Sequence, residues 1–138
     1  MDIEGQIRWL RIVASITIFF GLLTTVAAYP AANGFIIWLA DLMVWPIDGA
    51  QTGLDSTARL MFAIGGGIFI GFGAMWLAIA GAPYRAAPKA LRHVLIIGAV
   101  TWFVSDSVGS VLAEAAFNIL GNIGFLAMLL WPIRRAAA

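Results

Sequence analysis

The residues best suited to chemistry are polar side chains inside otherwise apolar segments. Polar groups are costly at membrane depth and usually face a partner or a cavity. Glu114, Asn118 and Asn122 are spaced by four, which would place them on one stripe of a helix. Asp106 lies in the apolar segment just before them. These carboxylates and amides could hold the polar group of a ligand.

Arg59 is a cation inside an apolar segment, four residues after Asp55. An unpaired guanidinium deep in lipid would cost on the order of 2.5 kcal/mol or more. Asp55, Asp106 and Glu114 are its candidate partners. In one interpretation Arg59 clamps neighbouring helices through Asp106 or Asp55, and Glu114 is the exposed acid that begins the last helix. In the other, Arg59 recognises the anionic group of a ligand beside a carboxylate.

A polar pocket that opens toward the outer side of a membrane is therefore the predicted functional site. Its floor is expected to be apolar and lined by glycine, and the tryptophan-containing segment 35–45 is expected to roof it. The predicted ligand-binding residues are Arg59, Asp106, Glu114, Asn118, Asn122, Asp55, Trp102 and Thr24.

Other kinds of chemistry have little support in the sequence. His93 is the one histidine and there is no cysteine, which excludes bis-histidine haem ligation within the chain and thiol redox chemistry. No HExxH motif or phosphate-binding loop is present. Asp41, Asp48 and Asp55 lie seven residues apart and lack the spacing of an EF-hand. We expect no metal, no cofactor and no catalytic residue.

The composition shows what must position these side chains. The 138 residues are 62% hydrophobic and 11% charged, with a mean hydropathy of +0.97 and a formal net charge of +1. Soluble domains are nearer half apolar and a quarter charged. The sequence therefore excludes an ordinary soluble domain, a disordered chain, a basic nucleic-acid binder and a disulfide-stapled module.

The apolar segments predict an all-α fold, an integral membrane four-helix bundle within a single domain. A span needs roughly 20 residues. An extra short interfacial helix between the first two spans is too apolar for water and too short to cross. The alternatives are a cleaved signal peptide for the first span, a re-entrant piece within the last stretch, and a simple spacer for the short segment. The predicted spans are 10–29, 57–82, 91–110 and 113–133, and the interfacial segment is 35–45.

The charges predict how the bundle is oriented. With four spans, seven of the eight basic residues lie on the side of both termini, and five of the seven acids lie on the other side with Arg59. Cationic loops are retained in the cytoplasm. We therefore expect a multi-pass protein of the bacterial inner membrane with both termini cytoplasmic.

Small residues recur every four positions in the second span, at Ala63, Gly67 and Gly71. Such ridges let helix backbones approach closely in lipid. They predict packing within the bundle or, as a sharper alternative, a homo-oligomer formed through Gly67 and Gly71.

The four-span layout, the long first outer loop and the stretch LDSTARLMFAIGGGIFIGFG resemble the small four-helix bacterial inner-membrane proteins of the DoxX-like type. Some members accompany quinone-linked oxidoreductases, so the resemblance implies a role beside a larger membrane complex. An independent redox activity does not fit a chain without cysteine.

Three classes of function follow. The first is a non-catalytic protein that binds a membrane lipid or small amphipathic ligand, or serves as an accessory subunit. The second is a proton or ion pathway. The third is a membrane-embedded lipid-modifying enzyme that uses Asp106 and Glu114. We favour the first.

Overall fold

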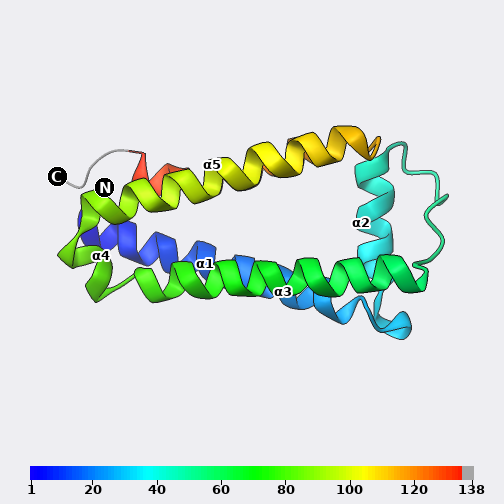
Figure 1. The fold of residues 1–138 in the computed structure, drawn as a ribbon, viewed down its shortest axis with the longest axis horizontal. Helices are drawn as coiled ribbons and strands as arrows, with labels where there is room; N and C mark the ends of the chain where they lie inside the picture. Colours follow the sequence, from blue (N-terminus) through cyan, green and yellow to red (C-terminus); the bar gives the residue numbers. More distant parts are fainter. Residues whose placement is uncertain (135–138) are drawn as a thin grey trace.

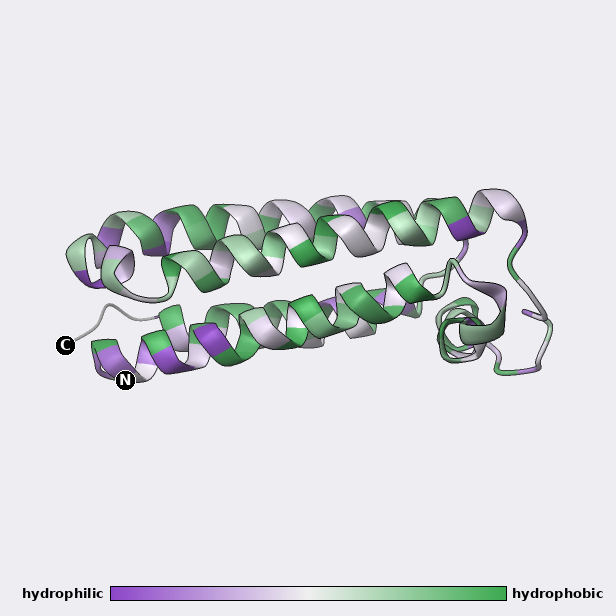
Figure 2. Cartoon of the chain, turned by 90° about the horizontal axis from the view of Figure 1, so that it is seen from below, coloured by the Kyte–Doolittle hydropathy of each residue, from purple (hydrophilic) through white to green (hydrophobic). Residues whose placement is uncertain are grey.

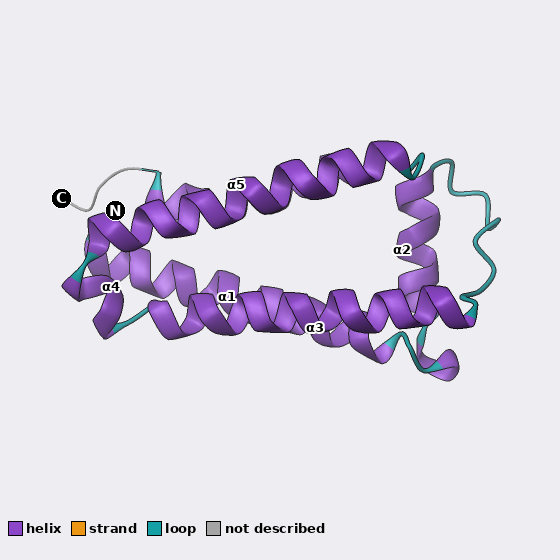
Figure 3. Ribbon diagram, in the orientation of Figure 1, coloured by secondary structure: helices purple, strands orange, loops and turns teal. Residues whose placement is uncertain are grey.

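The chain folds into helices joined by short connections, as a computed structural model that describes residues 1–134 shows (Figures 1 and 3). No strand occurs within these residues, and the all-α prediction is confirmed. The elements are α1 (Ile3–Val26), η1 (Pro30–Ala32), α2 (Gly34–Val44), α3 (Ser56–Ile79), α4 (Ala82–Ala86), α5 (Pro88–Leu112), α6 (Asn118–Leu130) and η2 (Trp131–Ile133).

Local sequence signals explain where the long helices begin. The carboxylate of Asp2 accepts a hydrogen bond from Gly5 N, and that of Asp55 accepts one from Ala58 N. Each acid thereby satisfies a backbone donor that the first turn leaves unpaired, and it suits the positive end of the helix dipole. Helix α5 begins at Pro88, whose missing N–H costs nothing at a first helical position.

The long helices form two pairs, α1 with α3 and α5 with α6. The N-terminus, α4 and η2 lie at one end of the molecule (Figure 1). At the other end α2 runs across the bundle, and Figure 2 shows this helix end-on. The predicted segment 35–45 is thus a helix, and it crosses the mouth of the bundle.

Glycines bring α1 and α3 into close contact. A Cβ on Gly66 would lie 2.6 Å from the carbonyl oxygen of Gly21, and one on Gly73 would lie 2.9 Å from that of Ala14. A Cβ on Gly67 or Gly71 would meet nothing within 4 Å. The prediction that the Gly67 ridge packs within the bundle is therefore wrong, because the packing face is offset by one residue. A homo-oligomer through Gly67 and Gly71 stays a prediction.

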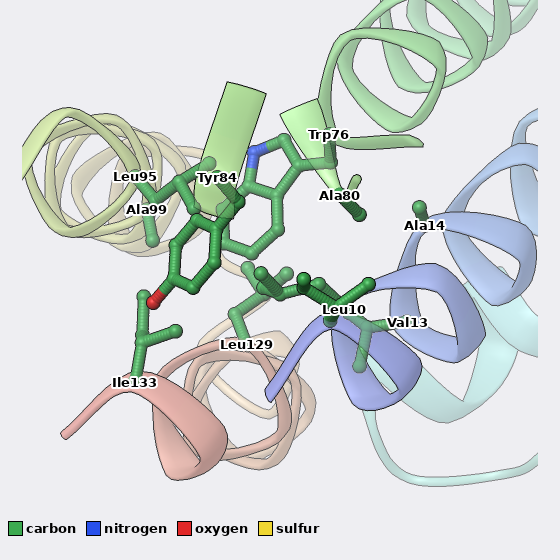
Figure 4. Packing of buried hydrophobic residues seen from close by; sticks show 11 residues of the cluster. Leu10, Val13, Ala14, Trp76, Ala80, Tyr84, Leu95, Ala99, Leu129 and Ile133 are labelled. Atoms are coloured by element: carbon green, nitrogen blue, oxygen red, sulfur yellow. The ribbon is translucent and has the colours of Figure 1, made fainter. Parts of the chain in front are cut away.

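A buried apolar core joins the two pairs near the termini (Figure 4). Leu10, Trp76, Tyr84 and Leu129 contribute to it from four different helices. The Tyr84 hydroxyl donates a 2.9 Å hydrogen bond to Gln6 Oε1. Burial raises the pKa of the Tyr84 phenol, so the hydroxyl keeps the proton that it donates.

Two arginines at the same end cap helix C-termini. Arg11 Nε donates to the carbonyl oxygen of Ala80 at 2.8 Å, at the end of α3. Arg92 donates through Nε to the carbonyl oxygen of Ile133, at the end of η2. Such cations satisfy carbonyls that the helix leaves unpaired and oppose the negative end of the helix dipole.

The long helices are largely apolar, and hydrophilic residues lie mainly toward their ends (Figure 2). Helices α1, α3 and α5 are long and apolar enough to cross a membrane. Exposed aliphatic side chains recur every three or four residues along α5, as expected for a lipid-facing stripe. This stripe comprises Val94, Ile97, Val100, Val104, Val108 and Val111.

The expected fourth span, 113–133, differs from the structure at its start. Helix α6 begins at Asn118, and with η2 it extends about 25 Å, short of a hydrocarbon core of ~30 Å. Residues before it form the turn that ends α5. There Glu114 N donates to Val111 O, and Ala115 N donates to Ser110 O. This pair of bonds is a Schellman motif.

Glu114 therefore lies in the turn that ends α5. The interpretation in which Glu114 begins the last helix is wrong. Its φ is 59°, in the left-handed region that glycine usually occupies at this position. Glu114→Gly is expected to raise the free energy of unfolding by about 1 kcal/mol, because a left-handed residue with a Cβ is strained. Chemical unfolding in detergent measures the change.

Ala113→Gly is the matched control for this prediction. Ala113 has φ −89°, where glycine relieves no strain, so this change should be neutral or destabilising. Stabilisation by both variants, or by neither, would contradict the strain at Glu114.

Candidate functional site

A cavity of about 800 Å³ lies between the two helix pairs and beneath α2. Its volume falls within the range of small-molecule pockets, roughly 300–1,000 Å³. All five long or crossing helices contribute to its wall. The α1 and α2 residues are Ile16, Phe20, Thr24, Ile36, Leu39, Ala40, Met43 and Val44; from α3 come Met61, Phe62, Gly65, Gly66 and Phe69. The remaining lining residues are Trp102, Asp106, Gly109, Ser110, Ala113, Ala115, Asn118, Gly121, Asn122 and Phe125.

Four aromatic rings, one from each long helix, meet at this cavity. Trp102 of α5 lies 5.1 Å from Phe125 of α6, measured between ring centroids. Phe69 of α3 lies 6.4 Å from each of these two rings and 5.5 Å from Phe20 of α1. Edge-to-face ring pairs at these separations are favourable. The aromatic cluster of Phe20, Phe69, Trp102 and Phe125 thus joins the two helix pairs at the cavity wall.

Asp106 is the acidic residue among the described lining residues of the cavity, and neighbouring side chains converge on one of its oxygens. Oδ1 accepts hydrogen bonds from Asn122 Nδ2 at 2.7 Å and Asn118 Nδ2 at 3.0 Å. Ser110 Oγ lies 3.3 Å from Oδ1, but its shorter hydrogen bond, 2.8 Å, goes to the backbone carbonyl oxygen of Asp106. Asn122 and Ser110 are buried, whereas Asp106 is half-buried. Asn118 and Asn122 reach it because they lie one turn apart at the start of α6.

The other oxygen of Asp106 remains available. Within residues 1–134, Oδ2 accepts no hydrogen bond, and no lysine, arginine or histidine lies within ion-pair distance of the carboxylate. The ion pair in this part of the chain joins Arg85 and Glu4 at the end that carries the N-terminus. Within the described residues, the cavity therefore holds an acid with neutral donors and no counter-ion.

The structure brings together five of the eight predicted site residues and leaves out three. Thr24, Trp102, Asp106, Asn118 and Asn122 line the cavity. The hydroxyl of Thr24 donates to the carbonyl of Gly21 in its own helix, so its proton is already used within α1. The other three, Arg59, Asp55 and Glu114, do not belong to the lining within the described chain.

The proposed clamp by Arg59 is not formed. Asp106 is engaged by amide and hydroxyl donors, and Asp55 caps α3 through Ala58 N. Glu114 is exposed in the turn after α5. Among residues 1–134, Arg59 makes no ion pair with any acid. The clamp was predicted from charge alone, but Arg59 lies outside the cavity lining and the donors that reach Asp106 are the neutral amides of Asn118 and Asn122.

Helix α2 covers the cavity with aliphatic side chains, including Leu39 and Met43, and not with tryptophan. Trp38 and Trp45 are half-exposed and are not lining residues. Trp45 stacks on Phe117 with ring centroids 4.9 Å apart, which fastens the end of α2 to the start of α6. The segment expected to roof the pocket does so, through a different face of its helix.

The sequence analysis missed the phenylalanines of the aromatic cluster. A signal existed for one of them, because Phe125 follows Asn122 by three residues and shares its helix face. The rings of Phe20 and Phe69 carry no polar group, and nothing in their spacing separates them from lipid-facing residues.

No group of three or more histidine, cysteine, aspartate or glutamate side chains in the described chain could hold a metal ion.

No protein-family model matches the sequence, and neither curated proteins nor solved structures give a match.

Proposed function

We propose that this protein is a non-catalytic integral protein of the bacterial inner membrane that binds a small amphipathic or lipidic molecule in the cavity beneath α2. The observation that carries the proposal is the make-up of this cavity. Its wall is apolar and aromatic, with one polar corner formed by Asp106, Ser110, Asn118 and Asn122. Such a wall suits an apolar body with a single polar group.

The distribution of charge supports an outward-facing cavity. Arg8, Arg11, Arg85 and Arg92 belong to the elements at the end that carries the N-terminus, whereas the cavity lies toward α2 at the other end. Arg135, also assigned to the cytoplasmic side, lies outside the described residues. With cationic segments in the cytoplasm, the cavity opens on the far side of the membrane.

The alternative functions fit the geometry less well. A transmembrane ion pathway would have to cross the aromatic cluster and then the buried core around Trp76 and Tyr84. A carboxylate-pair enzyme would need Asp106 and Glu114 at one substrate, but Glu114 is exposed and does not line the cavity. Ligand binding requires neither arrangement.

Filling the cavity tests this proposal. Gly65 lines the cavity, and a Cβ there would meet nothing within 4 Å, so Gly65→Trp adds bulk without a direct clash. Native mass spectrometry of the detergent-released protein would count bound decanol and decylamine, two single-chain amphiphiles. The wild type should bind one molecule, and Gly65→Trp should lose at least about tenfold in affinity, a change of about 1.4 kcal/mol.

Gly124→Trp serves as the matched control. A Cβ on Gly124 also meets nothing within 4 Å, but Gly124 does not line the cavity. This variant should bind as the wild type does. Equal binding by all three proteins, or no binding of either amphiphile by the wild type, would refute the proposed function.

A further inference from the structure

The geometry points to a lipophilic amine as the ligand: a protonated amino group that pairs with Asp106 Oδ2, on an apolar body that contacts the aromatic cluster. This inference deepens the proposed function and rests on it. It concerns which head group the cavity selects among amphipathic molecules.

The two carboxylate oxygens of Asp106 differ in their hydrogen-bond partners. The amides of Asn118 and Asn122 both donate to Oδ1, and the Ser110 hydroxyl lies beside it at 3.3 Å. Oδ2 has no donor within the described chain, although Asp106 lines the cavity. Oδ2 is also not among the buried side-chain atoms without a partner, so a molecule in the cavity can reach it. A ligand that brings a hydrogen-bond donor would supply the partner that this oxygen lacks within the described chain.

A second point is charge. Amide and hydroxyl donors are neutral, and neither Arg59 nor any other cation of residues 1–134 pairs with Asp106. In a site walled by apolar side chains, an uncompensated carboxylate attracts a cation far more strongly than it would in water. An alkyl carboxylate would be repelled, and an alcohol would supply a donor without a charge. A protonated amine supplies both.

A third point is the surroundings of the acid. Trp102 precedes Asp106 by four residues on α5, so both lie on one face of that helix and both line the cavity. The Trp102 ring adjoins Phe125 and Phe69. Aromatic faces attract ammonium groups, tryptophan most strongly, and they also contact alkyl chains. The same wall can thus hold the amino end and the adjoining part of the chain.

A matched series of ten-carbon ligands tests the inference on the wild-type protein, without relying on any variant. Decylamine, decanol and decanoate share one alkyl chain and differ in head group. In native mass spectrometry at neutral pH, decylamine should bind at least about tenfold more tightly than decanol, as expected for a charge-assisted hydrogen bond. Decanoate should bind most weakly.

Two variants then show whether the preference for decylamine over decanol depends on Asp106. Asp106→Asn keeps an acceptor for Ser110, Asn118 and Asn122 and should reduce the preference for decylamine over decanol to about twofold or less. Asp55→Asn removes the same charge outside the cavity and keeps a helix-capping side chain, so its preference should match that of the wild type. Thermal unfolding of each variant verifies that it is folded.

The outcomes separate this inference from the proposed function. If decanol binds as tightly as decylamine, or if Asp106→Asn keeps the full preference, the amine assignment is wrong, whereas occupancy of the cavity still supports ligand binding. If none of the three ligands binds the wild type, the proposed function fails and the inference fails with it.

Discussion

Gly66→Ala is expected to lower the free energy of unfolding by about 2–3 kcal/mol, in the range of overpacked sites. A Cβ at this position would lie 2.6 Å from the backbone oxygen of Gly21 and 2.6 Å from the backbone nitrogen of Thr25. Backbone atoms cannot rotate away as a side chain does, so α1 and α3 would have to separate. Unfolding in a detergent mixture of rising dodecyl sulfate content measures the loss.

Gly67→Ala is the matched control, one residue further along the same helix. A Cβ there would meet nothing within 4 Å. Alanine favours a helix over glycine by about 1 kcal/mol, so this variant should equal or exceed the wild type in stability. Similar losses at both positions would show that α1 and α3 do not pack through Gly66.

Asn122→Leu is expected to lower the free energy of unfolding by about 2 kcal/mol, the scale of a hydrogen bond to a charged group. The side chain is 5% exposed and donates the shortest hydrogen bond to Asp106, at 2.7 Å. Leucine has a similar size, so the loss reflects the missing donor more than a cavity. The same unfolding assay applies.

The double variant Asp106→Leu with Asn122→Leu distinguishes a polar interaction from general damage. Removing both partners of a buried polar pair costs less than the sum of the single changes. We expect a coupling of about 1–2 kcal/mol between the two positions. Asn33→Leu, at a residue whose side chain makes no capping bond, should be near neutral. Additive losses would rule out the Asp106–Asn122 interaction.

The helices could be predicted well from the sequence because hydrophobic runs and capping acids are local signals. Helices α1, α3 and α5 fall where the spans were expected. The start of α6 could not be predicted, because the sequence at Glu114 offers no glycine to mark a left-handed turn. The packing face of α3 was misplaced by one residue for a similar reason. Adjacent glycines at 65, 66 and 67 look alike until the position of α1 is known.

The polar residues of the site could be predicted, because they lie within apolar segments of the sequence. Asp106, Asn118 and Asn122 stand out because polar residues are rare in such segments. The absence of Arg59 from the cavity lining could not be predicted, since the distance between Arg59 and Asp106 depends on how the two helix pairs are placed relative to each other. The aromatic cluster likewise depends on tertiary packing, because its rings come from four helices.

In the proposed orientation, the arginines that cap α3 and η2 serve both membrane topology and folding. Arg11 and Arg92 belong to the basic set that is expected to hold the termini in the cytoplasm, and the same guanidinium groups close the ends of other helices. Selection on orientation and selection on stability therefore act on the same atoms. A lysine at either position would keep the topogenic charge but lose the Nε donor. Exchange between arginine and lysine should therefore be rarer at these two positions than at Lys89, which is exposed.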